Sequence, residues 1–169
     1  MRRATPADLA ALQHLEQGAF SGDRLSARSW RNLVSSPSAI VTVAIGADEA
    51  LLGATVLLLR ARSSVARLYS IAVDARARGR GIARQLMQRA IEDSHERRRA
   101  VLRLETRSDN RAAQALFRGL GFTELDRKPR YYEDGQAAWR FQKPLWNEGA
   151  ANEAVLPEAA AVVIFRNAS

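Results

Sequence analysis

The chain has 169 residues, of which 26% are charged and 47% are hydrophobic, and its formal net charge is +8. This length fits one globular domain, and the positive charge favours an anionic ligand or partner such as a nucleotide-like cofactor, RNA or an acidic protein. Zero cysteines exclude disulfides, thiolate metal sites and a cysteine nucleophile. No run approaches the roughly 18 apolar residues of a membrane span, and the start MRRATPADLAAL lacks the apolar segment of a signal peptide, so we expect a cytoplasmic protein.

The first half of the chain predicts a short strand, two helices and three further strands. After a strand over 2–4, Thr5 and Asp8 form a capping pattern that predicts a helix over 6–20. Ser26 begins a second helix that carries Trp30 and Leu33. The segments AIVTVAI, ALLGATVLLLR and VARLYSIAV then read as strands of an antiparallel meander.

The second half predicts alternating helices and strands. A helix is expected over 79–98, then the strand AVLRLET, then a helix over 110–119 that ends in the glycine cap GLGF. FTELDRK and AAWRFQKPL look like closing strands around PRYYEDGQ. The order predicts a mixed α/β fold with a mostly antiparallel sheet and one parallel, right-handed βαβ crossover over 68–106.

The domain is expected to cover residues 1–145, because the composition changes beyond them. The tail over 146–169 is rich in Ala, Glu and Asn, contains Pro157 and finishes with AVVIF. It is expected either to add a strand or to be disordered.

The segment RGRG at 78–81 lies between a predicted strand and a predicted helix. Two glycines there let backbone N–H groups converge on an oxyanion, and Arg78, Arg80 and Arg84 add positive charge. Neither common nucleotide-binding loop fits, since Arg84 replaces the third glycine of G-x-G-x-x-G and no Gly-Lys-Ser/Thr follows. A solvated, arginine-rich helix start is the plain alternative.

Residues 78–83, R-G-R-G-I-A, match the signature R/Q-x-x-G-x-G/A, and over 1–145 the chain resembles the GCN5-related N-acetyltransferases (GNAT). The resemblance implies the GNAT fold, a pyrophosphate of acetyl-CoA cradled by this loop, and pantetheine paired with the strand LYSIAV. The cofactor-binding residues that it implies are Ile71, Ala72, Val73, Arg78, Gly79, Arg80, Gly81, Ile82, Ala83, Arg84, Asn110, Ala113 and Phe117.

The block LETRSDNRAAQALFRGLGF is similar to the pattern L-E-x-R-x-x-N-x-x-A-x-x-L-Y-x-x-x-G-F of the ribosomal-protein alanine N-acetyltransferase subgroup. The resemblance implies that Glu105 is the general base, that Asn110 contacts CoA and that a tyrosine protonates the departing thiolate. Phe117 stands at the tyrosine position and has no proton to give. A thiol of pKa about 8.5 already leaves as thiolate at a cost of roughly 2 kcal/mol at pH 7, so this loss slows turnover without abolishing it.

Water or a tyrosine from RYYED is expected to replace the missing acid. Tyr131 and Tyr132 are therefore candidate catalytic and acceptor-binding residues, and half-buried strand aromatics are an equally good reading of both. For Glu105, whose face of the strand also carries Arg103, the alternative is a surface carboxylate paired with an arginine.

Glu16, Phe20 and Arg24 flank the loop between the first two helices, where the family shapes its acceptor pocket. Core packing explains Phe20 equally well. His14 and His95 fall on different predicted helices without further ligands at metal spacing, and no metal is expected.

These features predict an N-acetyltransferase, a monomer or homodimer with no membrane contact, that moves acetyl from acetyl-CoA to a primary amine by direct attack. The acceptor is a protein N-terminal α-amine, a lysine or a small amine, and Glu105 fits all three. An acyl-CoA-binding module with little catalysis is one alternative. A basic nucleic-acid-binding protein ranks last, because the basic segments lack interleaved aromatics.

Overall fold

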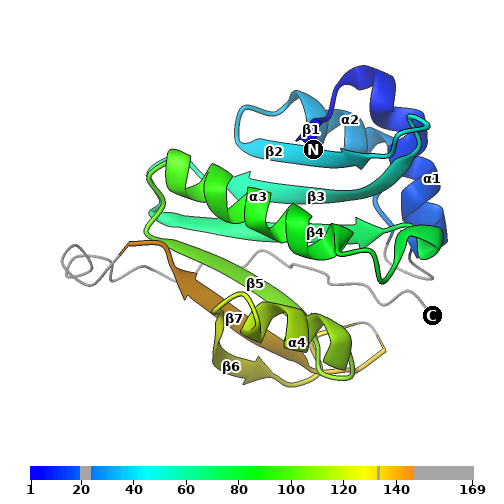
Figure 1. Ribbon diagram of the computed structural model, residues 1–169. Coiled ribbons are helices and arrows are strands. Elements are labelled where there is room, and N and C mark those ends of the chain that lie inside the picture. The colour runs from blue at the N-terminus through cyan, green and yellow to red at the C-terminus, as the bar shows by residue number, and fades with distance from the viewer. Residues whose placement is uncertain (20–23, 133, 147–169) are drawn as a thin grey trace.

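The computed structural model describes residues 1–19, 24–132 and 134–146. Within these residues the strands form one sheet in the order β1-β2-β3-β4-β5-β7-β6 (Figure 1). The strands are β1 (Arg2–Arg3), β2 (Ala39–Ile45), β3 (Leu51–Leu59), β4 (Val65–Val73), β5 (Val101–Arg107), β6 (Thr123–Lys128) and β7 (Ala138–Pro144). The helices are α1 (Leu9–Ala19), α2 (Ala27–Ser35), α3 (Ile82–Glu96) and α4 (Arg111–Arg118), with short 3-10 turns η1 (Pro6–Asp8) and η2 (Ala75–Ala77).

The predicted fold class is confirmed. In the described part of the chain β4 and β5 form the parallel pair, with α3 as the crossover between them, and the other neighbouring strands are antiparallel. Two helices begin three residues later than predicted. The first helix begins as the turn η1 before α1 starts at Leu9, and α3 begins at Ile82 because Gly79 and Gly81 have φ of +74° and +76°.

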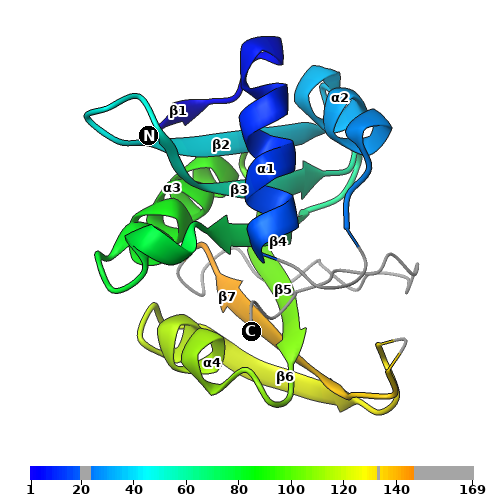
Figure 2. The same cartoon turned by 90° about the vertical axis from the view of Figure 1, so that its right-hand side faces the viewer.

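Two hydrophobic clusters hold the helices to opposite faces of the sheet (Figure 2). Leu12 and Leu15 of α1 and Trp30 of α2 pack on β2, β3 and β4. Met87 of α3 and Phe117 of α4 pack on the other face, against residues that include Leu102 and Leu104 of β5. The two faces of the sheet therefore carry different helices, and a side chain's face decides which neighbours it can meet.

Strands β4 and β5 separate shortly after they meet. Their paired positions end at Arg67 and Arg103, whereas β4 continues to Val73 and β5 to Arg107 (Figure 1). A bulge in the pairing of β3 with β4 leaves Tyr69 as an extra residue, since Val56 pairs with Ser70 and Leu57 with Leu68. The sheet therefore opens on one side of β4, beyond Arg67.

The end of the chain lies mostly outside the described residues. Residues 147–169, which contain nearly all of the predicted tail, are outside them, and so is Phe20. Trp146 is described, and its indole N–H donates to the carbonyl of Arg99 at 2.9 Å. No helix among the described residues is long and apolar enough to cross a membrane.

Candidate active site

The start of α3 presents a group of unused backbone donors. Gly81 in the left-handed conformation is its N-cap, and its carbonyl accepts from the N–H of Gln85 at 3.1 Å. The N–H groups of residues 82–84 have no hydrogen-bond partner within the described ranges. A Cβ at Gly79 or Gly81 would have no atom within 4 Å, so positive φ and not crowding requires glycine here. The loop is thus open toward solvent and aims donors at it, as an oxyanion site requires.

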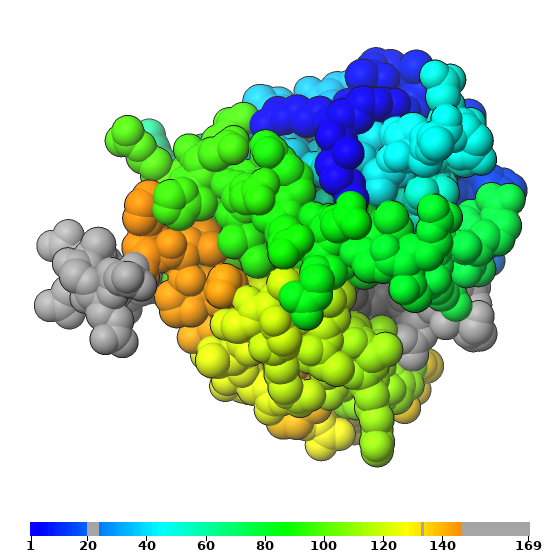
Figure 3. All heavy atoms as spheres, in the orientation of Figure 1, coloured from blue at the N-terminus to red at the C-terminus, as the bar shows by residue number. Residues whose placement is uncertain are grey.

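Positive side chains surround these donors. Arg78, Arg80 and Arg84 are exposed, and none of them has an ion pair with a residue that the structure describes. Figure 3 shows the start of α3 (green) above α4 (yellow-green), with a hollow between the two. Arg84 extends toward Gly119 at the end of α4, where a Cβ would lie 3.2 Å from its guanidinium. An anion at the start of α3 would therefore meet N–H groups and guanidiniums together.

The free edge of β4 beyond Arg67 faces the opening between β4 and β5. The N–H of Asp74 donates to the carbonyl of Leu52 on β3 at 2.9 Å, and antiparallel pairs alternate between bonded and unbonded. Ser70 and Ala72 therefore point their N–H groups at β3, and Ile71 and Val73 point theirs into the space between β4 and β5. The two outward N–H groups can bind a carbonyl oxygen or a ligand that lies along the strand.

Glu105 is buried at the point where β4 and β5 diverge. It is 3% exposed, its Oε1 accepts a hydrogen bond from the guanidinium of Arg67, and its Oε2 has no hydrogen-bond partner among the residues that the structure describes. Burial raises the pKa of Glu105 above its usual value, while Arg67 and then Arg140 oppose the rise. The pairing with an arginine was one of the two readings of the sequence, but the carboxylate is in the interior and not on the surface. A buried oxygen without a donor, on a carboxyl whose pKa is raised, is suited to accept a proton.

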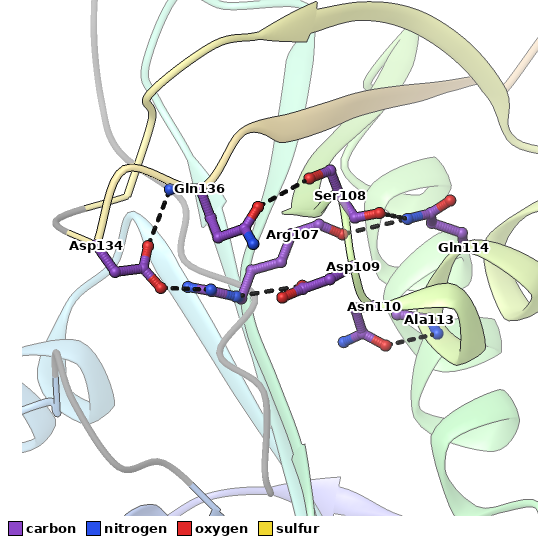
Figure 4. A network of polar contacts seen from close by, with 8 residues as sticks. All are labelled: Arg107, Ser108, Asp109, Asn110, Ala113, Gln114, Asp134 and Gln136. Atoms are coloured by element: carbon purple, nitrogen blue, oxygen red, sulfur yellow. Dashed lines mark hydrogen bonds and ion pairs between the residues drawn. The ribbon is translucent and has the colours of Figure 1, made fainter.

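The loop after β5 is fixed by a hydrogen-bond network (Figure 4). Asn110 is the N-cap of α4, and its side-chain oxygen accepts from the N–H of Ala113 at 3.0 Å. Gln114 donates to the carbonyls of Arg107 and Ser108 at 3.2 and 3.1 Å. The side-chain oxygen of Asn110 is engaged in the cap, and the side-chain NH2 group remains to donate to a ligand.

Phe117 lies fully in the core. It is 0% exposed and packs against Phe122 and Phe141, with ring centroids 6.0 and 5.8 Å away. In this arrangement Phe117 has no exposed surface with which to contact a cofactor, so its role in the structure is packing.

The two candidate tyrosines lie at the connection between β6 and β7. Tyr132 is buried with its ring 4.9 Å from the guanidinium carbon of Arg107, and Tyr131 packs edge-on against it at 5.2 Å. Arg107 also pairs with Asp134 at the turn (Figure 4). Because Arg107 and Glu105 are two residues apart on β5, Tyr132 lies on the same face of the sheet as the buried carboxylate.

The residues predicted to line the acceptor pocket differ in their surroundings. Glu16 is buried, and its carboxylate accepts from the N–H of Leu25 at 2.6 Å, which fixes the chain where it enters α2. Arg24 is exposed, and Phe20 lies outside the described residues. His14 and His95 are exposed, and no group of three metal-ligating side chains occurs among the residues that the structure describes.

Arg67 is the site residue that sequence reasoning missed. It is 38 positions from Glu105 in the chain, and only the parallel register of β4 and β5 brings the two together. Strand alternation predicts that Arg67 and Leu68 lie on different faces of their strand, but the sequence does not show which strand pairs with it.

Comparisons with known proteins agree with this geometry. Residues 9–122 match the acetyltransferase (GNAT) family. An uncharacterized protein of Mycobacterium leprae is 31% identical over 130 residues, which are 76% of this chain and 35% of that protein. The ribosomal protein bS18-alanine N-acetyltransferase of Salmonella typhimurium is 39% identical over 71 residues, 42% of this chain and 48% of that protein. The chain therefore spans about half or less of the length of these curated relatives.

Solved structures match over more of their length. The crystal structure of the ribosomal-protein-S18-alanine N-acetyltransferase from Escherichia coli superposes with a TM-score of 0.77 and 26% identity, over 88% of this chain and 95% of that one. The NatC complex bound to Gag peptide and CoA, at 23% identity and a TM-score of 0.71 over 85% of this chain and 99% of that one, shares the fold. With the family match covering well over half of its residues, this chain belongs to the GNAT family of acetyltransferases.

Proposed function

We propose that this chain transfers acetyl from acetyl-CoA to the α-amine at the N-terminus of a peptide or protein, with Glu105 as the general base. One observation carries the proposal: beyond Arg67 the strands β4 and β5 part, and the opening collects the outward N–H groups of β4 and the buried carboxylate of Glu105.

The residues at the start of α3 fit the phosphates of acetyl-CoA. The N–H groups of residues 82–84 have no partner in the described part of the chain, and a Cβ at Gly79 or Gly81 would project into open space. Arg78, Arg80 and Arg84 supply positive charge. The edge of β4 runs from this loop toward Glu105. Ile71 and Val73 would therefore hold the pantetheine of acetyl-CoA, which joins the phosphates to the acetyl group. Acetyl-CoA supplies the acetyl group as an activated thioester.

The chain's own groups then have two tasks. An N–H of Ile71 or Val73 donates to the acetyl carbonyl oxygen and stabilises the negative charge that builds there, which is worth a few kcal/mol per donor in other enzymes, roughly 3 to 4. The Oε2 of Glu105 accepts the proton that the amine releases as it attacks, directly or through one water. Tyr132 and Tyr131 are our candidates for returning a proton to the departing thiolate.

The α-amine is favoured over a lysine by acidity and by the relatives. At pH 7 an α-amine of pKa about 7.8 is roughly a tenth neutral, whereas a lysine of pKa about 10.4 is neutral only about four times in ten thousand. The relatives that match this chain include proteins named as ribosomal-protein alanine N-acetyltransferases.

The test measures CoA release with acetyl-CoA and a panel of ribosomal N-terminal peptides, lysine peptides, polyamines and free amino acids. Glu105→Gln should lower kcat by at least about 100-fold, which is typical for loss of a general base. Glu124→Gln is the matched control, because Glu124 is exposed on β6 and pairs with Arg118 on the other face of the sheet.

Acetyl-CoA binding by calorimetry without release to any amine would contradict the enzyme and favour the acyl-CoA-binding module. Equal activity of Glu105→Gln and the wild type would contradict the role of Glu105 alone.

A further inference from the structure

A row of charged side chains crosses the sheet on the face that carries Glu105. The register places Arg67 of β4 beside Arg103 of β5, Glu105 opposite Arg140 of β7, and Arg140 opposite Asp126 of β6. Arg103 and Glu105 are two residues apart on one strand, so they share a face. The row holds three guanidiniums and two carboxylates.

Both carboxylates of the row already have a guanidinium. Glu105 pairs with Arg67, and Asp126 pairs with Arg140. Arg103 is half-buried, its Nε is buried without a partner, and it makes no hydrogen bond or ion pair with any residue in the described ranges. Arg140, and Arg103 from farther away, lower the pKa of Asp126, so Arg103 shares this carboxylate only through its charge and is hydrogen-bonded to no carboxylate among the described residues. The planar guanidinium fork of Arg103 matches a carboxylate.

The phosphates of acetyl-CoA are on the wrong side of the sheet to be this partner. The neighbours of Arg103 on β5, Leu102 and Leu104, point to the opposite face and pack with Met87 of α3 and Phe117 of α4. The start of α3 lies on that face. A ligand for Arg103 must therefore approach from the face of Glu105, which is where the acceptor amine is needed.

We infer that the preferred acceptor is a peptide N-terminus whose second residue is Asp or Glu, and that its carboxylate pairs with Arg103. The inference rests on the proposed function, because Glu105 fixes the place of the amine. Residues two apart on a strand are separated by about 6.6 Å. A carboxylate on the second residue of a peptide, one Cα step of about 3.8 Å beyond the first, can span this distance. In a free α-amino acid the amine and the α-carboxylate share one carbon and are closer together than this spacing.

The experiment uses three peptides that differ only at the second residue, which is Glu, Gln or Lys, with the full chain and acetyl-CoA. We expect kcat/KM for the Glu peptide to exceed that for the Gln peptide about 10-fold, mostly through KM, with the Lys peptide poorest; a factor of ten corresponds to about 1.4 kcal/mol. Arg103→Gln should remove the difference between the Glu and Gln peptides, and Arg103→Glu should prefer the Lys peptide. Arg127→Gln is the control, because it removes the same charge from an exposed position on β6 that pairs with Trp139 on the other face.

The outcomes separate the inference from the function on which it rests. Equal kcat/KM for the three peptides would overturn the inference while the observed acetylation upheld the proposed function. No acetylation of any peptide would overturn both. A preference for Glu that survives in Arg103→Gln would overturn the role of Arg103, and free glutamate used better than the Glu peptide would overturn the peptide as acceptor.

Discussion

Two effects act on the pKa of Glu105 in opposite directions. Burial raises the pKa of the carboxyl, and the ion pair with Arg67 lowers it, with burial the larger of the two. A raised pKa brings a base closer to neutral pH, where proton transfer from an amine is most efficient. Arg67 limits this rise, because its positive charge favours the ionised carboxyl. If Glu105 is the general base as proposed, the pair sets the pH range in which it acts.

Replacement of Arg67 should move that range. Glu105 accepts a proton only when ionised, so kcat falls as the pH falls through the pKa of the folded enzyme. Arg67→Met removes the guanidinium that lowers this pKa, so the acid limb of the profile of kcat against pH should move to higher pH. Arg67→Lys keeps the positive charge, so its acid limb should stay close to that of the wild type. An acid limb that stays in place in Arg67→Met would show that Arg67 does not tune the base.

The loop before α3 shows how an element is fixed by a few backbone angles. Gly79 and Gly81 adopt positive φ, so the helix begins only at Ile82, and the N–H groups of its first residues have no partner among the described residues. A side chain at either position would be strained by its backbone and not by its neighbours. The two glycines therefore keep the N-terminus of α3 open to a ligand.

Gly81→Ala should cost about 1 to 2 kcal/mol of folding free energy and weaken acetyl-CoA binding, because the left-handed conformation is unfavourable for alanine. Gly18→Ala is the matched control: Gly18 lies in α1 with an ordinary φ and open space, so the same change should stabilise the fold by roughly 0.5 to 1 kcal/mol. Thermal unfolding and calorimetry of both variants measure the two effects. Unchanged binding in Gly81→Ala would argue against a phosphate site at this loop.

Local patterns predicted the elements, and long-range pairing decided the rest. Helical spacing and glycine caps placed the helices to within a few residues, and the crossover from β4 to β5 followed from the order of elements. The sequence did not show that β7 lies between β5 and β6, nor that β4 contains a bulge at Tyr69. Glu105 was identified through a motif, but its partner Arg67 depends on strand register, and the complete burial of Phe117 depends on how α4 packs.

The whole molecule consists of two parts of one sheet that meet over a short pairing. The strands β1 to β4 with α1, α2 and α3 form one part, and β5, β7 and β6 with α4 form the other (Figures 1 and 2). The paired positions between them are limited to Val65 to Arg67 on β4 and Val101 to Arg103 on β5. A ligand that contacts both strands beyond these pairs would supply contacts that the sheet lacks, so its binding should stabilise the whole fold.

Acetyl-CoA at about 100 times its Kd should stabilise the protein by about 2.7 kcal/mol, or roughly 5 to 10 °C in Tm for a chain of this size. Hydrogen exchange tells where it binds. In the free protein the N–H groups of Ile71 and Val73, which point away from β3, should exchange faster than those of Ser70 and Ala72, which bond to it. Acetyl-CoA should slow Ile71 and Val73 most, because its pantetheine would take the place of the missing strand. A rise in Tm without this protection would place the ligand elsewhere, and RNA that stabilises the fold more than acetyl-CoA would favour a nucleic-acid partner for the positive charge.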